Sequence, residues 1–127
     1  MFTHIMVGSN DIARSQTFYN AIFEALDIAP SDVHANGRLV YAQHGSRFIV
    51  GTPLDGKPAT GANGGTIGFE AKSPAMAEAW YKAGVANGGT AIENPPGVRQ
   101  TSNGPLYLAY LRDPDGNKLC VMYKEPQ

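Results

Sequence analysis

Apolar residues along this chain follow two different periods. Residues 2–8 and 65–71 are short, largely apolar stretches, which predict β-strands. After Ser9-Asn10-Asp11, apolar positions such as Ile12, Tyr19 and Phe23 recur at three- and four-residue steps, which predicts an amphipathic helix ending near Asp27. A second helix is expected to start at Pro74 behind the N-cap Ser73 and to end at Asn87-Gly88-Gly89.

The remaining apolar stretches are short enough for strands, and turn residues separate them. The expected strands are residues 38–43, 47–51, 90–92, 106–111 and 118–123. The turns expected between them are His44-Gly45-Ser46 and Asp113-Pro114-Asp115-Gly116-Asn117, with a loop at Asn94-Pro95-Pro96-Gly97. A further strand around residues 28–35 is less well defined, since Pro30 and Asn36-Gly37 interrupt it.

The order of elements occurs twice. Ile5, Ala13, Phe18 and Tyr19 match Ile67, Ala75, Trp80 and Tyr81 at a constant offset of 62 residues. The chain of 127 residues is long enough for one domain with its own core. We therefore predict a single α+β domain made of one module at about 1–52, a linker at about 52–65 and a second module at about 65–125.

Composition and charge exclude several classes of function. The net charge is −1 and no run of basic residues occurs, which argues against nucleic-acid binding. The single cysteine, Cys120, cannot form an intrachain disulfide. The first residues lack the basic start and long apolar core of a signal peptide, and no apolar run reaches membrane-spanning length. We expect a cytoplasmic protein without a membrane partner, and we find no phosphate-binding loop, dinucleotide fingerprint or nucleophile elbow.

Three segments carry a recognisable pattern: residues 3–19 with the Thr3-His4-Ile5-Met6-Val7 strand, Gly88-Gly89, and residues 110–119 around Asp113-Pro114-Asp115-Gly116-Asn117. Together they resemble the vicinal oxygen chelate superfamily of glyoxalase I, bleomycin- and fosfomycin-resistance proteins and extradiol dioxygenases. The resemblance implies two βαβββ modules, each of which curls a mixed sheet into half of an open cup, and it implies a homodimer. It does not select one activity, because such folds serve many functions.

The resemblance also gives positions for a metal site, since metal-dependent relatives place one His, Glu or Gln on each of four strands. Here those positions hold His4, Ile49, Thr66 and Cys120. Isoleucine has no ligand atom, and a threonine hydroxyl is a poor ligand for zinc, nickel or manganese. His34 or His44 would have to supply a third ligand. We therefore predict neither a bound divalent metal nor another cofactor.

Strand alternation extends the expected ligand pocket. Its residues are His4, Met6, Arg47, Ile49, Thr66, Gly68, Arg99, Tyr110, Cys120 and Met122. Arg99 is expected in a loop that closes over the cup, and Tyr107 and Tyr110 are candidates for stacking. The competing interpretation is structural: a hydrogen-bonded core histidine, a buried small thiol and solvated arginines.

Such a lining favours a small apolar or aromatic ligand. Our first hypothesis is a binder or resistance-type protein without chemistry. The alternative is a glyoxalase-like lyase or isomerase, or a dioxygenase-type enzyme, that uses His4 with an atypical metal site. His4 and Cys120 are the candidate catalytic residues in that case, as base and nucleophile. A third hypothesis is a structural or regulatory protein that binds no small ligand.

Overall fold

Each half of the chain contributes one helix of 13 residues. In the computed structural model, which describes residues 1–126, these are α1 (Ile12–Glu24) and α2 (Pro74–Ala86). The side chains of Asp11 and Ser73 cap the helices, each accepting a hydrogen bond from the backbone N–H three residues further on. The helix α2 begins and ends 62 residues after α1, so the structure reproduces the offset of the sequence repeat.

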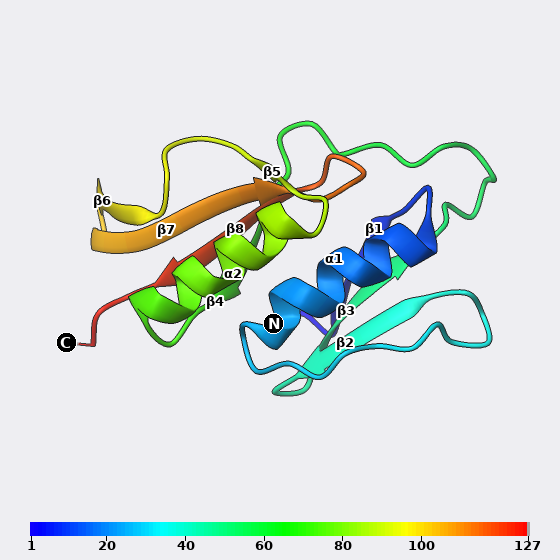
Figure 1. Cartoon of the computed structure of the whole chain (residues 1–127), viewed down its shortest axis with the longest axis horizontal. Coiled ribbons are helices and arrows are strands. Elements are labelled where there is room, and N and C mark those ends of the chain that lie inside the picture. The colour runs from blue at the N-terminus through cyan, green and yellow to red at the C-terminus, as the bar shows by residue number, and fades with distance from the viewer. Residues whose placement is uncertain (127) are drawn as a thin grey trace.

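The strands form two open mixed sheets, and Figure 1 shows them side by side with one helix over each. The three-stranded sheet has the order β1-β3-β2, and the five-stranded sheet has the order β4-β8-β7-β5 with β6 also paired to β7. The strands are β1 (His4–Gly8), β2 (Leu39–Gln43), β3 (Ser46–Gly51), β4 (Ile67–Glu70), β5 (Thr90–Ala91), β6 (Gly97–Thr101), β7 (Gly104–Arg112) and β8 (Lys118–Tyr123). The predicted α+β class with two open mixed sheets is thus confirmed.

Residues 28–35 form no strand. The backbone groups of Ser31 bond to side chains, and the N–H groups of Ile28 and His34 donate to the carbonyls of Phe23 and Arg38. The backbone N–H of Ser31 donates to Asn20 and its carbonyl accepts from Gln16, both on α1. The Ser31 hydroxyl accepts from the backbone N–H of Val40. Because these bonds satisfy the segment without a ladder, the first sheet keeps three strands.

The second difference from the sequence prediction is β6. Residues 97–101 pair antiparallel with the start of β7, so that Arg99 lies opposite Leu106. The expectation of Arg99 in a loop is therefore wrong. The turn that joins the two strands has Gly104 at φ 92°, and the Thr101 hydroxyl donates to the Gly104 carbonyl. This hairpin gives the second sheet its fifth strand.

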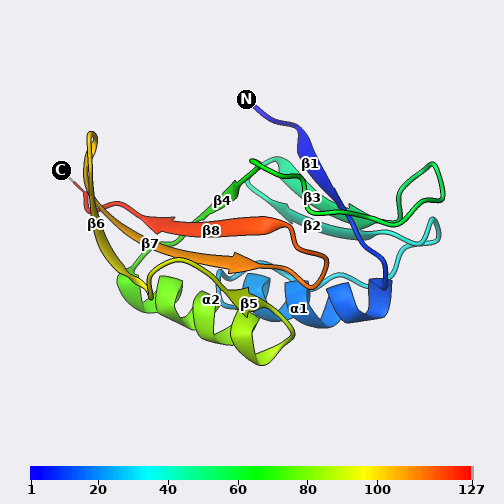
Figure 2. The ribbon, with the colours of Figure 1, turned by 90° about the horizontal axis from the view of Figure 1, so that it is seen from above.

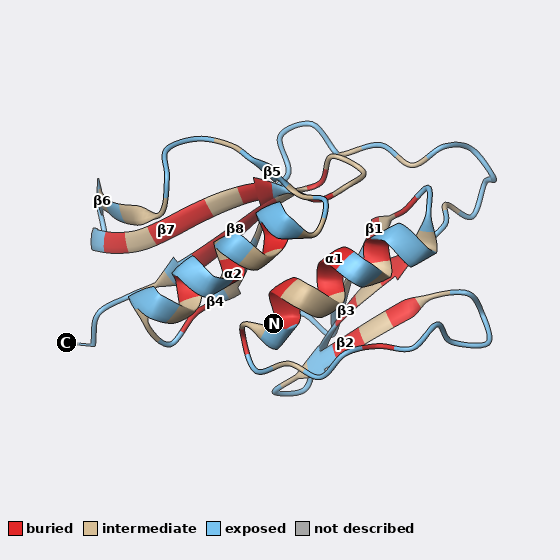
Figure 3. Cartoon of the chain, in the orientation of Figure 1, coloured by how far each residue is buried: buried red, intermediate tan, exposed pale blue. Residues whose placement is uncertain are grey.

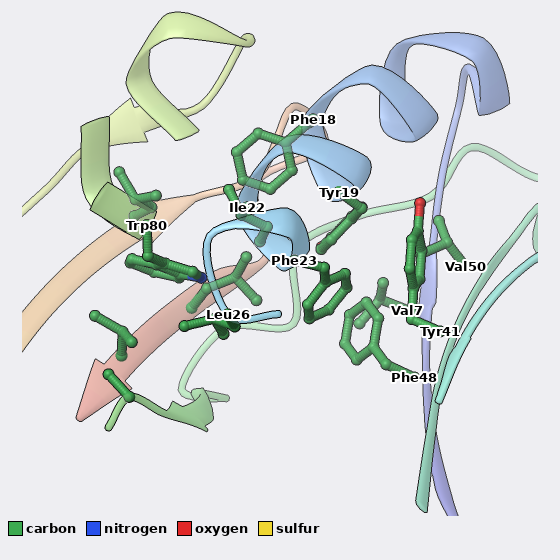
Figure 4. Packing of buried hydrophobic residues seen from close by; sticks show 14 of the residues in the cluster. Val7, Phe18, Tyr19, Ile22, Phe23, Leu26, Tyr41, Phe48, Val50 and Trp80 are labelled. Atoms are coloured by element: carbon green, nitrogen blue, oxygen red, sulfur yellow. The ribbon is translucent and has the colours of Figure 1, made fainter. Parts of the chain in front are cut away.

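The core lies between the helices and the sheet faces turned toward them (Figure 3). Both helices lie on the same side of the sheets, and the residues before β1 extend from the other side (Figure 2). Aromatic side chains connect the two halves, and Figure 4 shows Phe23 beside Tyr41 and Phe48. Phe69 of β4 joins this group, with ring centroids 5.1 Å from Phe23 and 6.5 Å from Trp80. One continuous core therefore fixes both sheets relative to each other.

Polar contacts also join the halves, at the turn between β7 and β8. The Asp115 carboxylate accepts hydrogen bonds from the backbone N–H of Asn10 and the guanidinium of Arg14. The Asp113 carboxylate accepts from the hydroxyl of the buried Tyr19 on α1. Because buried carboxylates are stable only when their oxygens are bonded, this turn is a specific docking point for α1. None of the helices within residues 1–126 is long and apolar enough to cross a membrane.

Candidate functional site

A groove opens between the two sheets, where the ends of β1, β2 and β3 face the edge of β4. We call it the central groove, and its volume is about 590 Å³. It lies within the range of 300–1,000 Å³, roughly, that small-molecule sites occupy. Aromatic residues from four elements line it, together with polar residues of the β2–β3 turn. The lining residues are Met1, Phe2, His4, Ile5, Phe23, Ile28, Tyr41, Ala42, Gln43, His44, Gly45, Ser46, Arg47, Phe48, Ile67, Gly68 and Phe69.

Strand alternation separates the polar side of the groove from its aromatic side. His4 and Arg47 are register partners on the parallel strands β1 and β3, so their side chains point to the same face. Both are exposed, and the Nδ1 of His4 lies 3.0 Å from the Thr3 hydroxyl. Phe48, the next residue on β3, points to the opposite face and is buried against α1.

The sequence prediction included three groove residues: His4, Arg47 and Gly68. The aromatic residues Phe23, Tyr41, Phe48 and Phe69 were missed. In the sequence they belong to separate amphipathic patterns, each of which indicates core packing. Only the packing of α1, β2, β3 and β4 shows that their edges reach one groove.

The other expected pocket residues lie outside the central groove. Met122 lines a second groove of about 640 Å³ along β4, which has no histidine or arginine in its lining and which Gly68 borders as well as the central groove. Met6 lies beside a third, shallower hollow against the linker. Thr66 is exposed just before β4, and Ile49 is partly buried on β3.

Cys120 belongs to a small apolar cluster on the five-stranded sheet. It is 5% exposed and packs with Leu106 and Leu108, with Tyr110 beside them. Burial raises the pKa of the Cys120 thiol, while the Tyr110 hydroxyl opposes this shift. The same burial raises the pKa of Tyr110, whose ring has the Lys118 ammonium 5.0 Å from its centroid. A neutral thiol in this setting is a weak nucleophile.

Arg99 uses its guanidinium to hold the chain that precedes it. Its Nη1 donates to the carbonyls of Pro95 and Gly97 at 3.0 Å, and its Nη2 donates to the carbonyl of Asn94 at 2.8 Å. These three bonds fix the turn before β6. Arg99 therefore has a structural role, which the sequence did not indicate.

The residues at the family's metal positions do not fit a metal ion. Ile49 offers no donor atom, Thr66 offers a hydroxyl, and the Cys120 thiol would have to ionise in an apolar cluster. Within residues 1–126, no three His, Cys, Asp or Glu side chains gather in a way that could hold a metal.

Comparison with known proteins identifies the fold and the family. A crystal structure of a glyoxalase/bleomycin resistance protein from Albidiferax ferrireducens T118 superimposes with a TM-score of 0.94 at 48% identity, covering 98% of this chain and 99% of that one. A putative glyoxalase from Bacillus halodurans has a TM-score of 0.75 at 15% identity, covering 98% and 96% of the two chains. Lactoylglutathione lyase from Agrobacterium tumefaciens has a TM-score of 0.66 at 18% identity, covering 97% and 92%.

The two more distant structures show the fold alone, and no curated protein sequence matches the chain. The sequence model of the Glyoxalase/Bleomycin resistance protein/Dioxygenase superfamily matches residues 1–121. The chain therefore belongs to this superfamily.

Proposed function

We propose that this protein binds a small, flat, apolar or aromatic molecule in the central groove without the metal site common in its family. The observation behind the proposal is the combination of aromatic walls and a polar rim in one groove of about 590 Å³. The partly buried Phe69 offers a ring surface for stacking, Phe23 and Phe48 pack behind it, and His4 and Arg47 lie at the rim. A few convergent polar groups on an apolar wall are typical of small-molecule sites.

The second part of the proposal is a cytoplasmic homodimer. The sheet faces turned away from the helices expose Met6 to 40% and Met122 to 39%. Ile49 lies on the same face as Met6, because it is the register partner of Met6 on β3. A second copy of the chain would cover these apolar positions. Light scattering at micromolar concentration is expected to give about twice the monomer mass of 13.5 kDa, and a monomeric mass would contradict the dimer.

A catalytic function has one specific observation in its favour. The Thr3 hydroxyl engages the Nδ1 of His4, which leaves Nε2 for a ligand at the groove rim. An oriented imidazole is suited to proton transfer. A glyoxalase-like lyase or isomerase that uses His4 as a base is therefore the second candidate. Turnover that is abolished in His4→Ala while binding persists would support it over pure binding.

The binding proposal is tested by filling the groove. A Cβ atom built on Gly68 meets no heavy atom within 4 Å, so Gly68→Leu fits the fold and places its side chain at the groove. Planar aromatic fragments are screened by thermal shift, and the hits are titrated into wild type and variant. We expect Gly68→Leu to keep the melting temperature of the free protein and to lose the shift caused by the fragments.

Gly65→Leu is the matched control. Gly65 lies outside the lining of the central groove, and its Cβ would make only ordinary contacts, the nearest at 3.5 Å from the Ala62 carbonyl oxygen. This variant is expected to bind the fragments as wild type does. No stabilisation of the wild type by any planar fragment would refute the proposed function.

A further inference from the structure

The lining of the central groove contains cationic and imidazole side chains but no carboxylate. Its lining includes His4, His44 and Arg47, and none of the lining residues is an aspartate or glutamate. Arg47 contributes a permanent positive charge, since a guanidinium is not deprotonated in proteins. An anion in the groove would meet this charge with no carboxylate of the lining to oppose it.

The guanidinium of Arg47, on β3, is also free to bind a ligand. The guanidiniums on the five-stranded sheet and on α1, in contrast, already have partners. Arg99 is held by three carbonyls, Arg112 donates to the Gly116 carbonyl, and Arg14 pairs with Asp115. Among residues 1–126, Arg47 makes neither a salt bridge nor a side-chain hydrogen bond.

Although its side chain is free, the backbone of Arg47 is fixed. Its N–H donates to the Thr3 carbonyl at 3.1 Å, and its Cα is paired with His4 on one side and Ala42 on the other. The Cα atoms of Arg47 and His4 are therefore held side by side, and their side chains point to the same face. A carboxylate fits this pair well, because arginine binds its two oxygens through two parallel N–H groups.

The aromatic wall begins on the neighbouring residue of the same strand. Phe48 is 6% exposed, and its ring centroid lies 5.5 Å from that of Phe69 in an edge-to-face arrangement. Tyr41, the register partner of Phe48 on β2, also lines the groove. Phe69 is only partly buried and lines the same groove as Arg47, so a ring attached to an anionic group on Arg47 would contact Phe69, with the buried Phe48 packed behind it.

On the basis of the proposed function, we propose that the ligands of the central groove are planar aromatic carboxylates. Arg47 binds the carboxylate and acts as the specificity-determining residue, while Phe69 contacts the ring. His4 adds a second hydrogen-bond donor beside Arg47.

The test uses 2-naphthoate and its neutral analogue 2-naphthamide, which have the same ring system and nearly the same shape. Both are titrated by isothermal calorimetry into wild type, Arg47→Gln and Arg38→Gln, at fixed ionic strength. Arg38 is the control because it precedes β2 on the same sheet and does not line the groove. Binding is located by the amide NMR shifts of Gly68 and Phe69.

We expect wild type to bind 2-naphthoate more tightly than 2-naphthamide, with shifts at Gly68 and Phe69. Arg47→Gln should weaken 2-naphthoate binding about tenfold, the loss expected for one charge-assisted contact, and leave 2-naphthamide unchanged. Arg38→Gln should change neither. Equal binding of acid and amide, or loss of naphthoate binding in Arg38→Gln but not in Arg47→Gln, would overturn the carboxylate proposal and leave the proposed function standing. Absence of binding by both probes and by all neutral fragments would overturn the proposed function as well.

Discussion

The Cys120 thiol lies on the face of β8 turned away from α2, packed against Leu106 and Leu108. Burial raises its pKa because the thiolate loses hydration there. The Tyr110 hydroxyl, from the register partner on β7, offsets part of this effect because it stabilises the thiolate. The chemistry of this position is therefore decided by its neighbours and not by the residue type.

We predict that iodoacetamide alkylates Cys120 in the folded protein more slowly than free cysteine at pH 8. The thiolate is the reacting form, and a raised pKa lowers its fraction at any pH below that pKa. Tyr110→Phe should slow the reaction further, since it removes the group that lowers the pKa. Mass spectrometry follows the reaction, and denatured protein, with its one cysteine accessible, is the control. A folded-state rate equal to that of free cysteine would contradict this account.

At the scale of elements, local signals predicted most of the structure. Both helices and their caps, Asp11 and Ser73, follow from side chains within one turn. The secondary-structure predictions were wrong where contacts with residues distant in the sequence determine the local structure. Residues 28–35 are held by Asn20 and Gln16 of α1, and β6 depends on pairing with β7. No period or turn signal within those segments reports such partners.

The linker between the sheets shows the same dependence on distant contacts. A Cβ atom on Gly61 would lie 2.2 Å from the backbone carbonyl oxygen of Gly116, in the turn between β7 and β8. Backbone cannot move aside as a side-chain end does. Nearby, Asn10 exchanges two hydrogen bonds with the backbone of Ala59. The linker therefore packs closely against the turn between β7 and β8, backbone against backbone.

We predict that Gly61→Ala lowers the free energy of unfolding by about 1–3 kcal/mol, the usual cost of overpacking. Gly65→Ala, in the same linker, should change it by less than about 0.5 kcal/mol, because its nearest contact is an ordinary one at 3.5 Å. Urea unfolding of the two variants measures the difference. Equal free energies of unfolding of the two variants would show that the linker does not pack closely against the turn.

At the scale of the whole molecule, the central groove and the contacts between halves both arise from segments far apart in the chain. Phe23, Tyr41, Phe48 and Phe69 meet because one core spans both sheets. The sequence repeat predicted two similar halves, but the residues at which they meet do not repeat. Of the residues expected in the pocket, His4 and Arg47 line the central groove, whereas its aromatic residues were not among those expected.

Tyr19 and Asp113 provide the sharpest test of how the halves are joined. The Tyr19 hydroxyl donates to Asp113, which also accepts from the backbone N–H groups of Asp115 and Asn117 and from the Asn117 amide. Burial, and then the charge of Asp113, raises the pKa of Tyr19 well above its usual value. Unfolded tyrosine loses its proton near pH 10, roughly, whereas folded Tyr19 keeps it.

The unfolded state thus binds fewer protons than the folded state above this pH, so stability falls as the pH rises through that range. The contribution of Tyr19 to this slope is about 1.4 kcal/mol per pH unit. We predict that Tyr19→Phe lowers the free energy of unfolding by about 1 kcal/mol at pH 7, because the hydrogen bond to Asp113 is missing. Above pH 10 the free energy of unfolding of the variant should fall less steeply with pH than that of wild type. Urea unfolding from pH 7 to 11 measures both. Because the pKa values of Tyr41 and Tyr110 are also raised, the free energy of unfolding of the variant still falls somewhat with pH. A decline as steep as that of wild type would show that Tyr19 does not contribute to the pH dependence of stability.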